Sequence, residues 1–153
     1  MNLSKNAKFY NILGSGTTGT TDLQGSAVLD MSGYEGVVWI AQFADNTNST
    51  GGYSKLYHMH SDSTSTTDMV STTANASVSP ATTAVGAIDD SLLILDVYKP
   101  LKRYVSAYVT KDSTNDVEVK VIGIQYGAKL APVVQPTSTY GVTASAIGVS
   151  PTT

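Results

Sequence analysis

The sequence predicts an all-β domain, a single β-sandwich or jelly-roll-like barrel with extended N- and C-terminal arms. Three consecutive apolar runs, separated by polar breaks, lie between Ser91 and Tyr126 and have the length of strands. Apolar residues make up 41% of the chain and charged residues only 14%, so serine and threonine supply much of the polar surface. Threonine favours strands, and no window shows sustained helical periodicity. At 153 residues the chain is about one domain long and can bury a substantial core.

The first two of these runs predict two different kinds of strand. Residues 92–98 are apolar apart from Asp96, which is typical of a strand covered on both faces. This strand should end at Lys99-Pro100, because proline has no N–H for a ladder and restricts the residue before it. Residues 104–110 alternate between polar and apolar side chains, which predicts a half-buried strand.

The third run changes phase in the middle. In residues 117–121 the valines share one face, whereas in residues 122–126 the apolar side chains fall on the other face. The change occurs beside Gly123. It predicts either a β-bulge near that glycine or full burial of the second half of the strand.

The rest of the chain divides around a core domain at residues 26–128. Residues 1–25 are expected to form an N-terminal arm or peripheral strand followed by a loop. Within the core, strands are expected at 27–31 and 37–43, the second with a buried Trp39, and weak edge strands and connections at 63–90. Residues 129–153 are too apolar for a free tail and too sparse for a core element. They are expected to be an extended C-terminal arm ordered against another surface, or else a final strand packed on the same domain.

One polar row could hold a metal ion. His58, His60 and Asp62 recur at a spacing of two, so they share one face of a strand. Two histidines and a carboxylate can ligate zinc, but the sequence shows no companion cluster for the remaining ligands. We therefore expect a polar row that faces solvent or a neighbouring subunit, and no metal or other cofactor. In a subunit contact, these histidines would make assembly sensitive to mild acid.

Composition and motifs argue against several classes of function. The net charge is −3 with nine basic residues, which does not favour a nucleic-acid partner. No apolar run is long enough for a membrane-spanning helix, and the N-terminus lacks a signal-peptide core, so we expect a soluble protein made in the cytoplasm. Residues 14–19 match the letters of the dinucleotide fingerprint, but the residues that follow do not begin a helix. The usual catalytic motifs are missing, and we expect no enzymatic activity.

The order of elements between about residues 26 and 132 resembles a family of tailed-bacteriophage head decoration, or capsid cement, proteins. The most specific part of the resemblance is the segment Asp96–Tyr104 followed by Gln125-Tyr126-Gly127. The resemblance implies a β-sandwich or barrel that binds the outside of the capsid on the virion and bridges neighbouring subunits of the major capsid protein. The resemblance does not define the oligomeric state; for a capsid decoration protein we expect a homo-oligomer, taken as a trimer at threefold positions.

A set of interface residues follows from this hypothesis. Aromatic residues are enriched in interfaces, and sparse apolar arms can bury area on binding. The candidates for capsid or subunit contacts are Phe9, Tyr10, Tyr98, Lys102, Arg103, Tyr104, Tyr108, Val133, Val134 and Tyr140. The tyrosines could equally be ordinary strand residues with their hydroxyls at the rim, and the basic residues could be solvated turn charges. A carbohydrate-binding or tail-associated β-domain of the virion is the alternative function.

Overall fold

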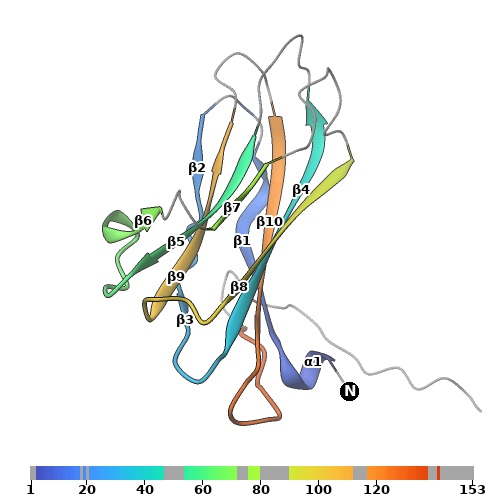
Figure 1. Ribbon diagram of the computed structural model, residues 1–153. Helices are drawn as coiled ribbons and strands as arrows, with labels where there is room; N and C mark the ends of the chain where they lie inside the picture. Colours follow the sequence, from blue (N-terminus) through green and yellow to red (C-terminus); the bar gives the residue numbers. More distant parts are fainter. Residues whose placement is uncertain are drawn as a thin grey trace, which may run out of the picture.

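The computed structural model is a sandwich of two antiparallel sheets (Figure 1), which confirms the predicted fold class. It describes residues 3–17, 19, 21–46, 54–71, 76–79, 90–111, 117–137 and 141. The four-stranded sheet has the order β1-β10-β4-β8, with strands β1 (Lys8–Thr17), β10 (Val117–Tyr126), β4 (Gly36–Asn46) and β8 (Ser91–Tyr98). A one-turn helix, α1 (Leu3–Asn6), precedes β1.

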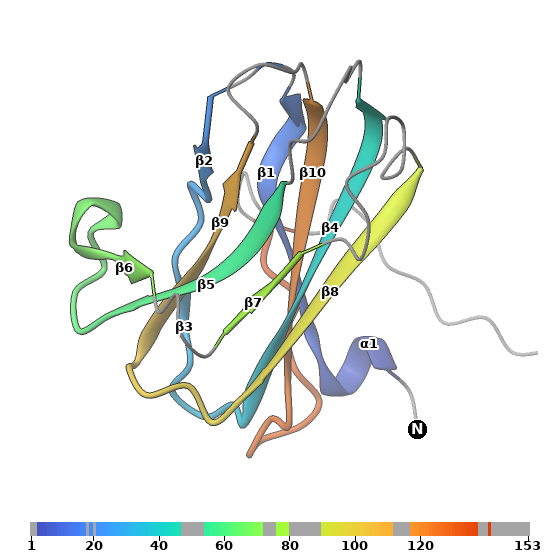
Figure 2. The same cartoon turned by 45° about the horizontal axis from the view of Figure 1, so that its top comes forward.

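The six-stranded sheet is made of two longer strands and four two-residue strands. Its path is β2-β9-β5-β6, formed by β2 (Leu23–Gln24), β9 (Tyr104–Thr110), β5 (Lys55–Ser61) and β6 (Val70–Ser71). The strand β3 (Leu29–Asp30) also pairs with β9, and β7 (Ser77–Val78) pairs with β5 and lies beside β8 (Figure 2). A short 3-10 helix, η1 (Thr66–Asp68), lies between β5 and β6. The weak strands expected at 63–90 are confirmed for the described part of that stretch.

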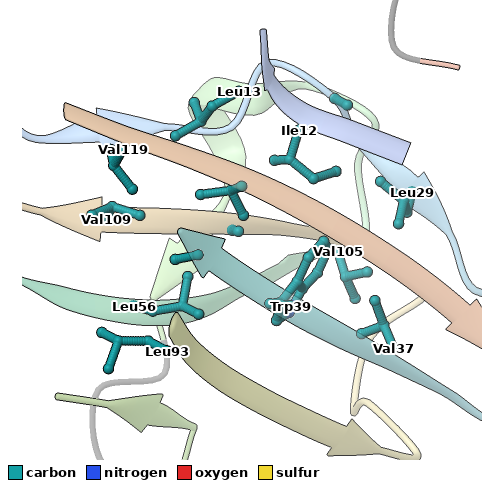
Figure 3. Close-up of a cluster of buried hydrophobic side chains, with 14 of the residues drawn as sticks. Ile12, Leu13, Leu29, Val37, Trp39, Leu56, Leu93, Val105, Val109 and Val119 are labelled. Carbon is teal, nitrogen blue, oxygen red and sulfur yellow. The ribbon is translucent and has the colours of Figure 1, made fainter. Parts of the chain in front are cut away.

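The core lies between the inward faces of the two sheets. Its centre is Trp39 on β4, which is fully buried as predicted and has Val105 of β9 close by (Figure 3). The alternation predicted for residues 104–110 is also confirmed, because Val105, Ala107 and Val109 are buried. These residues belong to one contiguous apolar cluster that receives side chains from both sheets.

The prediction for β8 is wrong in one respect. The strand runs from Ser91 to Tyr98 and ends before Lys99-Pro100 as expected, but it is the edge of its sheet and is covered on one face only. Leu93 points into the core, whereas Leu92 and Ile94 are more than half exposed. A continuous apolar run therefore does not mean that the strand is buried on both faces here.

The bulge expected near Gly123 is present on one side of β10 only. Against β1 the register shifts between Ile122 and Val121, opposite Asn11 and Leu13, whereas against β4 the strand stays in register across Gly123 and the irregularity lies between Glu118 and Val119. The other expectation is wrong: the second half is not fully buried, because Ile122 is 44% exposed. Gly123 faces inward, where a side chain would collide with the ring of Trp39. The apolar residues that follow Val121 lie on the outward face of the sheet.

The segment before Ser26 belongs to the domain and is not a free arm. β1 pairs with β10 along the edge of the four-stranded sheet, and Ile12 and Leu13 are part of the core cluster. The peripheral-strand interpretation is the correct one for this stretch, and the boundary expected at Ser26 comes too late in the chain. The stretch that resembled a dinucleotide fingerprint lies in β1 as far as Thr17, and the described residues after it form β2 without a helix.

The described part of the C-terminal segment also packs on its own domain. The backbone N–H of Val133 donates to the carbonyl oxygen of Lys5 at 2.9 Å. The Gln135 amide donates to the carbonyl oxygens of Ser4 and Ala7 at 2.8 and 2.7 Å. The same side chain accepts from the Phe9 N–H at 3.0 Å. For residues 129–137 the arm interpretation is therefore replaced by local docking against α1 and β1; residues 138–140 and 142–153 lie outside the described part.

Candidate functional site

The two segments that carry the resemblance meet at one end of the sandwich. Tyr98 at the end of β8 and Tyr126 at the end of β10 both pair with Gly36 at the start of β4. We call this the loop end and define it as residues 31–35, 99–103 and 127–134. It lies at the same end of the molecule as α1 (Figures 1 and 2).

A tyrosine bridges the three strands that lead into the loop end. The ring of Tyr126 crosses over Gly36, where any larger residue would collide with it. Its hydroxyl donates to the Asp96 carboxylate on β8 at 2.7 Å. Partial burial, followed by the hydrogen bond to Asp96, raises the pKa of Tyr126 to about 12, so the phenol stays protonated and keeps this bond over the physiological range.

Backbone hydrogen bonds tie the loops to one another. The Lys99 N–H donates to the Glu35 carbonyl at 2.8 Å, and the Glu35 N–H donates to the Tyr126 carbonyl at 3.0 Å. The Lys129 N–H donates to the Gly33 carbonyl at 2.9 Å. Gly127 turns the chain out of β10 with a φ of 65°, a conformation that favours glycine. The three loops therefore form one connected frame.

This frame exposes large apolar side chains. Leu101 and Leu130 are 86% and 87% exposed, and Val134 is 79% exposed. Exposed leucines on loops with fixed backbones are suited to enter pockets on another protein at little further entropic cost. Leu101 and Leu130 were not among the residues proposed from the sequence, although both lie in the stretch that carries the resemblance.

Two of the basic residues of the loop end, Lys102 and Arg103, are held by carboxylates. The Lys102 ammonium lies 2.5 Å from Asp62, and the Arg103 guanidinium contacts both carboxylate oxygens of Asp30 at 2.9 and 2.7 Å. The hydrogen bond from Arg103 is the main cause that lowers the pKa of Asp30. These pairs order the loop side chains, and each pair is neutral in net charge.

Two of the candidate tyrosines line an open cleft next to the loop end. Tyr10 of β1 and Tyr104 of β9 lie on a cavity of about 530 Å³ together with Asp30, Ser26 and the Thr64–Thr66 region. Arg103 lies over the ring of Tyr104, 5.1 Å from its centroid. Burial is the main cause that raises the pKa of Tyr10.

The remaining candidates lie in three different places. Tyr98 is 59% exposed on the outward face of β8, with the Lys99 ammonium 5.0 Å from its ring centroid. Phe9 is half-buried on the edge strand β1, and Val133 is buried beside Lys5. Tyr108 donates to Asp22 at 2.9 Å on the far half of β9, away from the other candidates. Tyr140 lies outside the described residues.

The histidine row faces the core. His58 and His60 share one strand face as predicted, with ring centroids 5.9 Å apart, but they pair with the inward-facing Ala107 and Val105. His58 is only 2% exposed and accepts a hydrogen bond from the Trp39 indole at 3.1 Å. The expectation of a row that faces solvent or a subunit is therefore wrong for His58. Asp62 is separate from the pair and contacts Lys102.

The outward side of the four-stranded sheet carries an apolar surface, here called the outer face, that was not predicted from the sequence. Its central row is formed by Ile122, Ile40 and Ile94 on three adjacent strands. Ile124 and Val38 form the next row. The phase change in β10 was the signal for this face, because it shows where apolar side chains move from the inward to the outward side.

A comparison with protein-family models and with curated proteins finds no match to this chain. Within the described residues, no helix has the length and apolar character needed to cross a membrane. The same residues bring no three histidine, aspartate or glutamate side chains into a metal-binding group.

Proposed function

We propose that this protein is a phage virion structural protein without enzymatic activity, which binds the outside of the capsid and stabilises it. The observation that carries the proposal is the meeting, at the loop end, of the two segments that resemble decoration proteins. There they support Leu101 and Leu130, whose side chains are almost fully exposed. The proposed partner is the major capsid protein, and the proposed location is the capsid surface.

The loop end supports a mechanism for such binding. Burying one exposed leucine completely contributes about 1.5–3 kcal/mol, so a few apolar anchors are enough for a weak single contact. Hydrogen bonds from Lys99 and Lys129, which lie two residues and one residue before the leucines, join the loops before binding, and this reduces the entropy lost on association. A decoration protein that contacts several capsid subunits at once would combine the free energies of these contacts. Many bound copies would together strengthen the shell.

Cosedimentation with undecorated capsids from the source phage tests this proposal. We expect saturable binding at a fixed ratio to the major capsid protein. Leu101→Asp and Leu130→Asp should each weaken binding at least about tenfold, because each puts a charge into an apolar contact. Val70→Asp is the matched control, since Val70 is 62% exposed on β6, which is not one of the three loops of the loop end. Absence of binding by the folded protein, or an equal loss with the control, would contradict the proposal.

A carbohydrate-binding role is the second candidate, and the cleft lined by Tyr10 and Tyr104 is the observation that favours it. Aromatic rings beside a carboxylate and hydroxyl groups are the side chains that bind sugars. Trp39 cannot serve this role because it is fully buried. Titration calorimetry with a panel of oligosaccharides, with Tyr104→Ala as the variant, tests this candidate. Copy number per particle separates capsid decoration from a tail-associated component.

A further inference from the structure

The outer face of the four-stranded sheet is a continuous apolar surface. Leu92, Ile94 and Ile122 are exposed by 55%, 56% and 44%. Ile122 and Ile94 flank the half-buried Ile40 of β4, Leu92 lies in the row on one side and the half-buried Val38 in the row on the other, so that three adjacent strands contribute. Antiparallel sheets commonly present polar side chains on a face turned to water. This sheet instead has an apolar inward face and an apolar outward face, as a sheet packed between two layers would.

The size of this face matches what a specific interface requires. The pairing of β4 with β8 extends from Gly36 to Phe43. With strands about 4.8 Å apart and a rise of about 3.3 Å per residue, the outward side of all four strands over that length, with the polar Asn11, Gln42 and Lys120 included, covers roughly 500 Å². Two such sides together would bury about 1,000 Å², the lower limit for a biological interface. The apolar part lies on three strands and covers at most roughly 380 Å². Apolar patches of a few hundred Å² on a monomer are often functional.

The charges around the face are compatible with a second copy of itself. Lys120 on β10 and Asp96 on β8 lie in the rows on either side of the central isoleucine row. Asp96 also accepts the hydrogen bond from Tyr126. Glu118 on β10 and Lys99 next to Tyr98 add a further charge of each sign at the rim, so two copies are not repelled by an excess of either. A face built for a strongly charged partner would show one predominant sign.

We propose that two copies of this chain pair through their outer faces in a two-fold dimer. Face-to-face packing of sheets, about 10 Å apart, is the usual way in which two apolar sheet faces bury each other. A two-fold contact uses the same patch on both copies, which fits a face whose apolar row lies at its centre. The loop end is not part of this surface, so a dimer leaves it accessible. The inference does not depend on the proposed function.

Sedimentation velocity of the full chain over a wide concentration range tests the dimer. The wild type should sediment as a dimer, and Ile94→Lys or Ile122→Lys should weaken the association at least about tenfold. These residues are exposed in the single chain, so the variants should stay folded, which Trp39 fluorescence verifies. Val70→Lys on the other sheet is the control and should remain dimeric. A monomeric or trimeric wild type, or a dimer that tolerates both lysines, would overturn the proposal.

A crosslinking experiment gives an independent readout. The chain contains no cysteine, so a single introduced thiol can bridge only two copies. Ile40→Cys, at the centre of the face, should be linked into a dimer by a bismaleimide reagent that spans about 10 Å, the separation of stacked sheets, whereas Val70→Cys should not. If Ile94→Lys weakens capsid binding while the wild type is monomeric, the outer face binds the capsid and self-pairing is rejected. If the wild type is a dimer but does not bind the capsid, only the proposed function is rejected and the dimer stands.

Discussion

A single glycine determines how the centre of the core is built. Gly123 lies directly opposite Trp39 on the neighbouring strand, and the absence of a side chain leaves room for the indole ring. The indole N–H then reaches His58 on the other sheet at 3.1 Å. A buried Trp N–H requires an acceptor, and an unprotonated imidazole nitrogen supplies it. This bond connects the two sheets through the core, as does the bond from the buried Gln125 amide of β10 to the Asp30 carbonyl of β3 at 2.7 Å.

This contact predicts an acid-sensitive fold. Burial, with a smaller effect from His60, lowers the pKa of His58 to about 4 from an ordinary value of 6.5. The unfolded chain therefore binds more protons between these values, and the stabilisation present above pH 6.5 is lost as pH falls toward 4. We expect a loss of about 3 kcal/mol from this group over that window. Urea unfolding followed by Trp39 fluorescence at a series of pH values measures it.

A matched pair of variants separates this effect from the titration of carboxylates. His58→Asn keeps an acceptor near the indole but cannot titrate, so this variant should lack the His58 part of the loss. His60→Asn leaves the Trp39 contact in place and should retain most of it. Identical pH profiles for the wild type and His58→Asn would contradict the assignment. In this structure the effect acts on folding, because His58 lies in the core rather than at a subunit contact.

At the scale of elements, β8 shows that exposure and apolar character are separate properties. Its inward side chains, such as Leu93, pack on the core, while Ile94 faces outward. We expect Leu93→Ala to lower the free energy of unfolding by about 2–5 kcal/mol, as for buried leucines. Ile94→Ala should cost less than about 1 kcal/mol in the single chain. Chemical denaturation of both variants at dilute concentration checks this difference, and equal losses would mean that the outer face is covered within the chain.

The sequence alone predicted correctly those strands whose pattern of polar and apolar residues has only one structural explanation. The alternation in β9 and the burial of Trp39 follow from local periodicity, and both are confirmed. The apolar run of β8 was ambiguous, because periodicity does not reveal whether the second face is covered by the same chain. Likewise, spacing placed His58 and His60 on one face but could not say that this face is the inner one.

The loop end could be predicted only in part. The sequence indicated which two segments carry the resemblance, but their meeting depends on the strand order β10-β4-β8, which is set by long-range pairing. Leu101 and Leu130 were missed because exposure of a leucine in a loop has no signature in a single sequence. The docking of Gln135 against Ser4 and Ala7 was missed because, like the strand order, it joins segments that are far apart in the sequence.

At the scale of the whole molecule, the N-terminal part is required for folding, because β1 belongs to the sandwich and the C-terminal segment docks against it. A chain that begins at Ser26 loses Ile12 and Leu13 from the core and leaves the edge of β10 without its partner strand. Removing two large buried aliphatic side chains costs about 2–5 kcal/mol for each, which is comparable to the whole stability of a domain of this size. We therefore expect the shortened chain not to fold, as judged by the loss of cooperative thermal unfolding.

Gln135→Ala perturbs the contact between the terminal segments more mildly than this deletion does. It removes the side chain that bonds the Phe9 N–H and the carbonyl oxygens of Ser4 and Ala7, but leaves β1 in its sheet. We expect a folded protein that is less stable by about 1–3 kcal/mol, with faster amide exchange at Phe9. Ser77→Ala, at an exposed position on β7 of the other sheet, is the control and should change stability by less than about 0.5 kcal/mol. Normal folding of the chain that begins at Ser26 would show that β1 is an arm after all, and that the core is complete without it.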